Sequence, residues 1–304
     1  MYTAIDAAER IAERLSKLAG MAAVALGGSW ARGTAHEDSD LDLGLYYYPE
    51  QRFSIAELSE LARQLDHRHS SPAHSLPSGG GRVPNDPRTT SMPVEGLVTP
   101  FGEWGPWING GGWLLIEGRH VDFLYRDLDK VADVVARCSA GQITCDYQIG
   151  HPAGFHNHIY MGEVHYCRAL HDPGGVLRAL KRLTAEYPPA MRRAIIDKYL
   201  YEARFSTAIA DKPAGRGDVH YVAGCLFRAV GCIVQVLFAL NRQYFVNEKG
   251  SLRAVESFEL KPPNFTAQVA AIEGATGATA DELAASVRHC GQLVEAVAGL
   301  WVNA

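Results

Sequence analysis

Hydrophobic positions in the first part of the chain change their spacing from helical to strand-like. In residues 4–18 they recur about every 3.6 residues, which predicts an amphipathic helix. Residues 21–26 form a short continuous apolar run, which is typical of a buried strand. Leucines alternate with aspartates and a glycine in residues 40–46, so this segment is predicted to be a strand with one apolar face. Residues 54–66 predict another helix.

Regular periodicity disappears from Ser70 to Gly112, where the chain is rich in Pro, Gly and Ser. Loops longer than about 15 residues inside a domain are usually functional lids or disordered segments. Trp104, Trp107 and Trp113 near the end of this stretch favour an ordered lid over a plain linker. These three indoles either cover the core or line a substrate pocket.

The rest of the chain predicts two strands and a helix, one more strand, and then helices only. In chain order, the strands are 113–116 and 121–125, the helix is 127–139, the next strand is 159–167, and the later helices are 174–185, 189–210, 217–242, 264–273 and 280–301. A mixed half followed by a helical half indicates an α+β protein. The expected architecture is an N-terminal domain, residues 1–172, with a mixed sheet flanked by helices, and an all-helical C-terminal domain, residues 173–304.

The composition narrows the class of protein. The 304 residues are 47% hydrophobic and 21% charged, which suffices for a sizeable core and excludes a mainly disordered chain. At roughly 100–200 residues per domain, the length agrees with two domains. The formal net charge of −5 argues against a general nucleic-acid coat, which needs a basic surface, but not against the binding of one nucleotide.

The sequence also predicts a cytoplasmic location. The N-terminus has neither the basic nor the apolar region of a secretory signal. The most apolar stretch, residues 219–240, is interrupted by Arg228 and Gln235, so it is expected to be a buried helix instead of a membrane span. None of the six cysteines lies in a CxxC pair, which argues against a structural zinc site of the usual spacing and agrees with a reducing compartment.

Three carboxylates form the candidate catalytic group. Asp40 and Asp42 lie two residues apart on a predicted strand, so both project from one face, with Cα atoms roughly 6–7 Å apart. Two like charges this close repel unless a cation lies between them. Asp122 lies on a later predicted strand and joins them if the two strands are neighbours. Mg²⁺ suits such a set, because it binds carboxylates together with substrate phosphates.

The turn before these carboxylates has the composition of a phosphate site. Gly27 and Gly28 let the backbone come close to a ligand, and a helix beginning near Ser29 would point free N–H groups at a phosphate. Ser29 adds a hydroxyl, and Arg32 adds a positive charge one turn later. The competing interpretation is a simple turn beside a solvated strand face, which leaves Asp122 unexplained.

The order of these motifs resembles the signature of the polymerase-β-like nucleotidyltransferase superfamily. The motifs are Gly-Gly-Ser at 27–29, Asp-Leu-Asp at 40–42 and the later Asp122. In style they are similar to the small-molecule branch, the aminoglycoside and lincosamide nucleotidyltransferases. The resemblance covers residues 22–46 and 120–125, whereas the helical half agrees only in its layout.

This resemblance implies specific roles for the motif residues. Gly28 and Ser29 would hold a nucleoside triphosphate, with ATP as the expected donor. Asp40 and Asp42 would bind two Mg²⁺ ions, and Asp122 would be the third carboxylate of the metal site. The helical domain would close over the nucleotide and its acceptor.

The resemblance also directs attention to the helical half. Enzymes of this type often draw a lysine to the triphosphate, and Lys198 is the candidate here. Glu202 lies four residues later on the same helix face and is the candidate base on the acceptor side. An ordinary surface ion pair between the two is the alternative. Tyr221 and Arg228 on the next predicted helix are weaker candidates for phosphate binding.

Four histidines lie close together in the sequence, at His151, His156, His158 and His165. A zinc site is conceivable, but no spacing among them fits a helical HxxxH pair. His156 and His158 are expected to share a strand face. Structural histidines, or histidines of an acceptor pocket, are therefore the favoured interpretation.

Together these features predict an enzyme that transfers a nucleoside monophosphate, AMP from ATP, to a hydroxyl of a small molecule and releases pyrophosphate. An aminoglycoside-like antibiotic is one expected acceptor, which would make the protein a resistance enzyme. Two alternatives stay open: the same chemistry on a protein or tRNA, as in toxin–antitoxin systems with this fold, and an inactive nucleotide-binding module. No membrane and no nucleic-acid polymer is expected as a partner.

Overall fold

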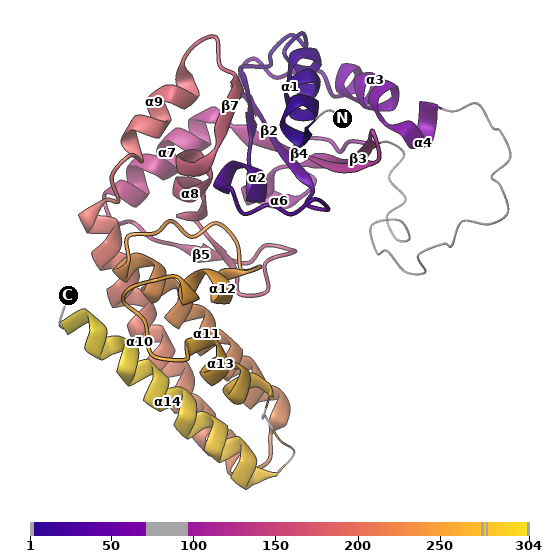
Figure 1. Ribbon diagram of the computed structural model, residues 1–304. Helices are drawn as coiled ribbons and strands as arrows, with labels where there is room; N and C mark the ends of the chain where they lie inside the picture. The colour runs from indigo at the N-terminus through magenta and orange to yellow at the C-terminus, as the bar shows by residue number, and fades with distance from the viewer. Residues whose placement is uncertain (1–2, 71–96, 275–276, 278, 303–304) are drawn as a thin grey trace, which may run out of the picture. The chain divides into compact units, whose positions relative to one another are not determined.

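The computed structural model describes residues 3–70, 97–274, 277 and 279–302, and it is an α+β protein (Figure 1). The chain forms two compact units. The first comprises Met1–Asp133 and Glu163–Leu183, and the second comprises Val134–Gly162 and Thr184–Ala304. Residue 172 lies inside the second segment of the first unit, and the assignment of separate tasks to residues 1–172 and 173–304 stays a prediction.

A five-stranded mixed sheet forms the centre of the first unit, in the order β3-β4-β2-β1-β7. Its strands are β1 (Ala23–Leu26), β2 (Leu41–Tyr47), β3 (Gly111–Ile116), β4 (Arg119–Asp127) and β7 (Arg168–His171). β2 and β4 pair in parallel, and the other neighbours are antiparallel. This arrangement confirms the predicted mixed sheet and makes the two strands that carry the candidate aspartates direct neighbours.

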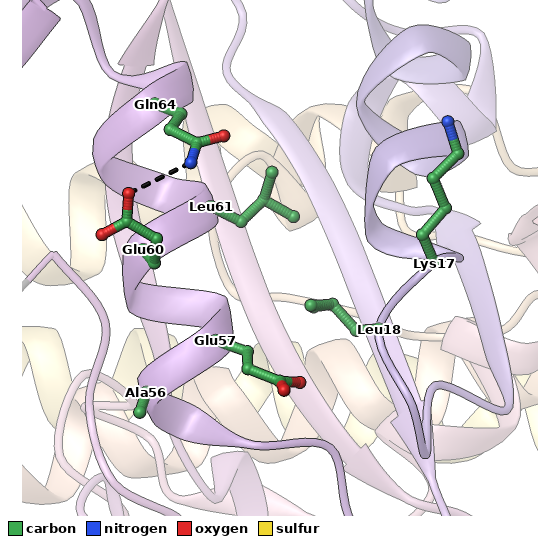
Figure 2. Close-up of a pocket in the computed structure, with 7 residues that line it drawn as sticks. All are labelled: Lys17, Leu18, Ala56, Glu57, Glu60, Leu61 and Gln64. Carbon is green, nitrogen blue, oxygen red and sulfur yellow. Dashed lines mark hydrogen bonds between the residues drawn. The ribbon is translucent and has the colours of Figure 1, made fainter.

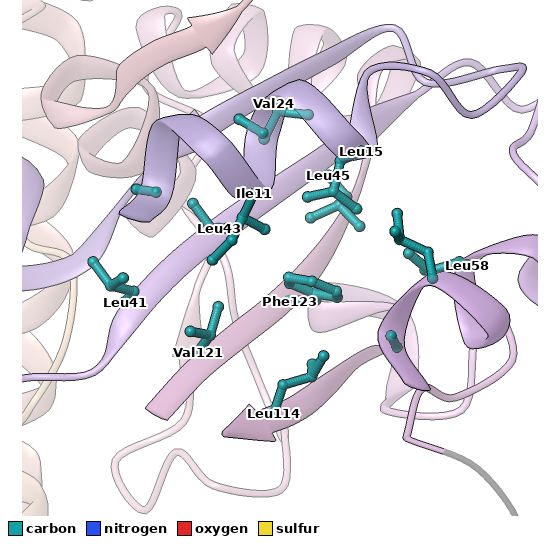
Figure 3. Close-up of a cluster of buried hydrophobic side chains, with 14 of the residues drawn as sticks. Ile11, Leu15, Val24, Leu41, Leu43, Leu45, Leu58, Leu114, Val121 and Phe123 are labelled. Carbon is teal, nitrogen blue, oxygen red and sulfur yellow. The ribbon is translucent and has the colours of Figure 1, made fainter. Parts of the chain in front are cut away.

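Alternation along β2 and β4 explains why the sheet has one apolar face. Leu43 on β2 and Phe123 on β4 are fully buried, and so are the residues two positions away on either side, which are Leu41, Leu45, Val121 and Tyr125. Helices α1 (Ala4–Leu15) and α3 (Ile55–Leu65) cover this face with Ile11, Leu15 and Leu58 (Figure 3). Burying one face fixes the register, because a slip by one residue would turn every apolar side chain to the other face.

The first unit contains further helices, of which α7 and α8 each have residues in both units. They are α2 (Gly28–Arg32), α4 (His67–Ser70), α6 (Gly105–Ile108), α7 (Leu128–Ser139), α8 (Ile159–Tyr166) and α9 (Val176–Leu183). Residues 71–96 of the expected lid lie outside the described residues. The described end of that stretch contains α6 and the beginning of β3.

The strand predicted over residues 159–167 is wrong, because residues Ile159–Tyr166 form helix α8. Residues 155–162 are buried without a break, so they show no amphipathic period that would distinguish a helix from a strand. Gly162 allows close packing, since a Cβ atom there would lie 2.7 Å from the Phe245 carbonyl oxygen. The other helices and strands predicted from periodicity are confirmed, with ends that differ by a few residues.

The second unit is mainly helical. Its elements are the strand pair β5 (Cys145–Asp146) and β6 (Phe155–His156) and the helices α10 (Pro189–Ala214), α11 (Val219–Leu240), α12 (Ser251–Glu256), α13 (Phe265–Gly274) and α14 (Ala280–Val302). The long helices α10, α11 and α14 pack against one another. Among the described residues, α11 alone is long and apolar enough to cross a membrane, but 72% of its most apolar window is buried inside the protein, as in a core helix.

A buried carboxylate connects α3 to the edge strand β3. Asp66, which follows α3, accepts hydrogen bonds from the Leu115 N–H (3.0 Å) and from the Arg68 guanidinium (2.6 Å to Nη2). Arg68 also donates to the Trp113 carbonyl at 2.9 Å. Burial alone would raise the pKa of the Asp66 carboxyl, but the hydrogen bonds from Arg68 and Leu115 outweigh it and lower the pKa below its ordinary value.

We expect Asp66→Asn to lower the free energy of unfolding by about 1–3 kcal/mol, because Arg68 loses its charged partner. Since the pKa is lowered in the folded state, the carboxylate stabilises the protein above its ordinary pKa of about 4, and this contribution is lost as the pH falls further. Urea denaturation at pH 7 and pH 3.5 measures both effects. Glu60→Gln, which removes an exposed i,i+3 partner of Arg63, is the control and should change stability by less than about 0.5 kcal/mol.

Candidate active site

Two of the predicted aspartates lie side by side on the sheet. The parallel register of β2 and β4 pairs Asp42 directly with Asp122. Neighbouring strands are about 4.8 Å apart, and directly paired residues point to the same face. Both side chains are partly buried, on the face opposite Leu43 and Phe123. The sequence predicted that Asp122 would join the other aspartates only if the two strands were neighbours. The pairing of β2 with β4 meets that condition for Asp42 and Asp122.

The row of paired residues continues on both sides of this carboxylate pair. On one side, the Gly27 N–H donates to the Asp42 carbonyl at 2.8 Å, which brings the end of β1 beside Asp42. On the other side, antiparallel pairing of β3 with β4 places Trp113 opposite Asp122. Gly27, Asp42, Asp122 and Trp113 thus form one row across four adjacent segments of the chain.

Gly28 lies against the carboxylate of Asp42. Its φ of +59° is in the left-handed region, and a Cβ atom built there would lie 1.7 Å from Asp42 Oδ2. No side chain larger than hydrogen fits at this position without moving Asp42. Helix α2 begins at Gly28, and its N-cap, Gly27, provides no side-chain cap for the first-turn N–H groups. These groups are therefore suited to an anionic ligand close to Asp42.

Side-chain contacts hold α2 and the following loop in place. The Trp30 indole donates to the Ser39 carbonyl at 3.1 Å, and the Arg119 guanidinium lies over the Trp30 ring at 5.7 Å. Asp40 follows Ser39 immediately and is partly buried one residue before β2. Arg32 is exposed, and its Nε donates to the Gly28 carbonyl at 3.2 Å. The sequence did not identify Trp30 as a residue that holds this loop. Its only signal was its position directly after Ser29.

The residues at this position fit a divalent cation bound together with phosphate. Among the residues that the structure describes, no group of three or more His, Cys, Asp or Glu side chains is already arranged around a cation position. The adjacent carboxylates of Asp42 and Asp122 are nevertheless hard oxygen donors, and Mg²⁺ is usually held by one or two carboxylates plus substrate phosphates and water. The Asp42 carboxylate lies in the space that a Cβ atom of Gly28 would occupy, so the turn and this donor are in direct contact.

A surface pocket elsewhere on the first unit contains none of the predicted site residues. It lies between α3 and the segment that follows α1, as Figure 2 shows. Its lining residues are Lys17, Leu18, Ala56, Glu57, Glu60, Leu61 and Gln64. The glycine turn and the aspartate pair therefore define the candidate site better than this pocket does.

The glycine turn beside the paired strand carboxylates agrees with the nucleotidyltransferase motif that the sequence resembles. Residues 8–71 match the family model described as a nucleotidyltransferase domain. Residues 8–71 are therefore identified as a nucleotidyltransferase domain, which supports the superfamily and the enzyme class predicted from the motif. This domain implies a nucleoside triphosphate substrate, and the family generally uses a divalent metal.

Two other comparisons describe the chain less specifically. Residues 158–249 match a domain of unknown function (DUF4037). Among solved structures, the chain is similar to a nucleotidyltransferase-like protein from Exiguobacterium sibiricum 255-15, with 7% sequence identity, a TM-score of 0.43, and coverage of 98% of this chain and 79% of that chain. No curated protein matches the sequence.

The candidate residues of the helical half all lie in the second unit. Lys198 donates to the Ile143 carbonyl at 3.1 Å, and Glu202 forms an ion pair with Arg228 at 2.6 Å. Arg228 is therefore a partner of Glu202 that sequence spacing did not suggest. The exposed Tyr221 lies in the first turn of α11, where its N–H donates to the capping Asp218. The roles of Lys198, Glu202 and Tyr221 in catalysis or nucleotide binding stay predictions.

Two of the four clustered histidines are buried and belong to a polar network. His156 Nδ1 lies 2.6 Å from the Tyr199 hydroxyl, and His158 Nε2 donates to the Gln235 side-chain oxygen at 2.9 Å. The rings of His156 and His158 lie 5.3 Å apart. His156 belongs to β6, whereas His158 lies just before α8, so the shared strand face expected for them is not present. Burial lowers the pKa of His156 to about 2 and that of His158 to about 4.

We expect Gly28→Ala to weaken binding of MgATP by at least about 10-fold, because the added Cβ atom displaces the Asp42 carboxylate. Gly33→Ala is the matched control, since Gly33 also has a positive φ (+70°) but a Cβ atom there meets nothing within 4 Å. The control bears the backbone strain alone. Isothermal titration of both variants with MgATP measures the difference, and equal affinities would contradict the assignment of this turn.

The buried histidines predict loss of stability in mild acid. Above pH 6.5 they are neutral in both folded and unfolded chains, but below it the unfolded chain binds protons that the folded protein excludes. Each histidine then removes about 1.4 kcal/mol per pH unit from the free energy of unfolding. Denaturation at pH 7.5 and pH 5.5 should show a smaller acid effect in His158→Gln than in the wild type. Replacement of the exposed His220 by Gln should leave the acid effect unchanged.

Proposed function

We propose that the protein transfers a nucleoside monophosphate, AMP from ATP, to a hydroxyl group of a small molecule and releases pyrophosphate. The observation that supports this most directly is the in-register pairing of Asp42 with Asp122 beside the glycine turn at Gly28. These features support the proposal, because carboxylates suited to a metal lie close to backbone N–H groups suited to phosphate. The nucleotidyltransferase family match over residues 8–71 supports the same chemistry.

Each motif residue has a defined task in this proposal. The first-turn N–H groups at Gly28 and Ser29 bind the phosphates, the Ser29 hydroxyl donates to a phosphate oxygen, and Arg32 contributes positive charge. Asp40, Asp42 and Asp122 hold two Mg²⁺ ions with the nucleotide. When bound, these ions supply neutralisation of the phosphate charge and activation of the attacking oxygen.

The order of the row sets the direction of the reaction. In phosphoryl transfer the attacking and leaving oxygens lie roughly in line. The phosphate turn is at the β1 end of the row, so pyrophosphate leaves toward Gly28 and the acceptor hydroxyl approaches from the side of Asp122. Asp122 then both completes the carboxylate set and accepts the hydroxyl proton. Its place between the metal carboxylate Asp42 and the outer strand supports this double task.

The second unit contributes supporting residues in this proposal. The resemblance to the family supports a contact of Lys198 with the triphosphate, with Tyr221 as a weaker candidate, and closure of the helical domain, residues 173–304, during the reaction. Glu202 could act as an acceptor-side base only if its ion pair with Arg228 opens. That requirement favours Asp122 over Glu202 as the group that takes the proton.

The acidic balance of the chain favours a small acceptor over a polymer. Its net charge of −5 provides no electrostatic attraction for tRNA. All six cysteines are free thiols, which agrees with a cytoplasmic location. A protein or tRNA acceptor, and a nucleotide-binding module without turnover, are the alternatives that experiment has to separate from a small-molecule transferase.

Asp42→Asn and Asp122→Asn should each lower pyrophosphate release by at least about 10²-fold while leaving the fold intact, because each removes a carboxylate from the metal site. Asp129→Asn is the control, since Asp129 is exposed at the start of α7, away from the row of site residues.

With α-labelled ATP in a cell lysate, the label should appear on small metabolites. Label on protein or RNA would instead support a protein or tRNA acceptor. Binding of MgATP without pyrophosphate release would support a nucleotide-binding module without turnover.

A further inference from the structure

Two tryptophans stack at the outer end of the carboxylate row. The rings of Trp104 and Trp113 lie 4.7 Å apart between centroids, with an interplanar angle of 23°. Trp113 belongs to β3, and Trp104 comes directly before α6. Stacked indoles form a rigid flat surface, because each side chain has only two rotatable bonds to order.

Both rings lie on the face of the sheet that carries the aspartates. Trp113 is paired directly with Asp122, so their side chains point to the same side. Gly111, two residues before Trp113, makes room for the second ring, because a Cβ atom there would lie 2.6 Å from an atom of the Trp104 indole. A Cβ atom at this position would also lie 1.8 Å from the Phe123 carbonyl oxygen, so the glycine leaves room for both the neighbouring strand and the Trp104 ring.

Trp113 is not a core residue. Its side chain is 41% exposed, whereas its neighbours Leu114 and Ile116 on the other face of β3 are buried. Covering of the hydrophobic core, which is the alternative role for these indoles, therefore does not account for Trp113. A large aromatic ring kept at the surface beside a catalytic carboxylate has the properties of a ligand contact.

The direction of the reaction identifies which ligand reaches these rings. Phosphate binds at the Gly28 end of the row, and the carboxylates of Asp42 and Asp122 separate it from the tryptophans. In-line displacement places the acceptor opposite the leaving pyrophosphate, on the Trp113 side. The strand spacing puts Trp113 about 5 Å beyond Asp122, which is the reach of a ring attached to the reacting hydroxyl.

From this arrangement we propose that Trp104 and Trp113 form the acceptor subsite and that the acceptor carries its hydroxyl on, or one bond away from, a planar aromatic ring. The inference rests on the proposed function for the position of the phosphate. It distinguishes between acceptor classes: a planar ring covers the indole with its whole face, whereas a non-planar amino sugar contacts it only through C–H groups and its ammonium.

Binding of three model alcohols tests the subsite without requiring turnover. The probes are 2-naphthalenemethanol, which is planar and aromatic, cyclohexanemethanol, which is neither, and glucosamine, which is cationic. Calorimetric titrations use the full chain with Mg²⁺ and a non-hydrolysable ATP analogue. We expect 2-naphthalenemethanol to bind at least about 10-fold more tightly than the other two, and Trp113→Ala to abolish that preference.

Two further variants keep this test specific. Trp113→Phe retains a flat ring and should restore most of the preference. Tyr48→Ala removes an aromatic side chain of the same unit that is equally exposed (40%) but lies beyond the row of site residues, and it should leave binding unchanged. Equal binding of the three alcohols, or a preference that survives in Trp113→Ala, would overturn the subsite.

Pyrophosphate release from ATP with the same alcohols separates this inference from the proposed function. Release with 2-naphthalenemethanol, with a KM raised about 10-fold or more in Trp113→Ala and a kcat close to that of the wild type, supports both. Release with glucosamine alone, unaffected by Trp113→Ala, overturns the aromatic subsite and leaves the transferase intact. Tryptophan-dependent binding without release from any of the three alcohols leaves an aromatic-binding surface at these rings and contradicts their role as the acceptor subsite.

Discussion

The parallel pairing of β2 with β4 is the constraint on which the candidate site depends. It places Asp42 and Asp122 on the same face at the distance of neighbouring strands. The hydrophobic core holds this register, because Leu43 and Phe123 occupy the buried face of the same two strands. A shift of either strand by one residue would turn its aspartate toward the core and away from the aspartate of the other strand. The packing of the first unit and its chemistry are therefore coupled.

The second unit is organised by buried polar contacts as well as by helix packing. His158, Tyr199 and Gln235 belong to one network, and all three lie within the stretch that matches the domain of unknown function. Buried polar groups are costly unless they are paired, so such a network selects one packing of the segments that contribute to it. Its histidines stay neutral in the folded state, because burial lowers their pKa.

Local sequence patterns predicted most of the elements and the motif residues of the site, whereas long-range pairing had to come from the structure. The alternation around Leu43 and the glycines before Ser29 carry their structural meaning locally. The pairing of Trp113 with Asp122 depends on a hairpin register, and the partner of Glu202 turned out to be Arg228, on another helix, instead of Lys198. The segment 159–166 forms a helix and not the predicted strand, because residues 155–162 are buried without a break and show no period.

Diffraction from crystals grown with Mn²⁺ and a non-hydrolysable ATP analogue would test the central claim most directly, because anomalous scattering locates the metal independently of activity. The account predicts Mn²⁺ within about 2.2 Å of carboxylate oxygens of both Asp42 and Asp122, with the triphosphate over the N–H groups of Gly28 and Ser29. A nucleotide bound elsewhere, or a metal that contacts neither carboxylate, would contradict it.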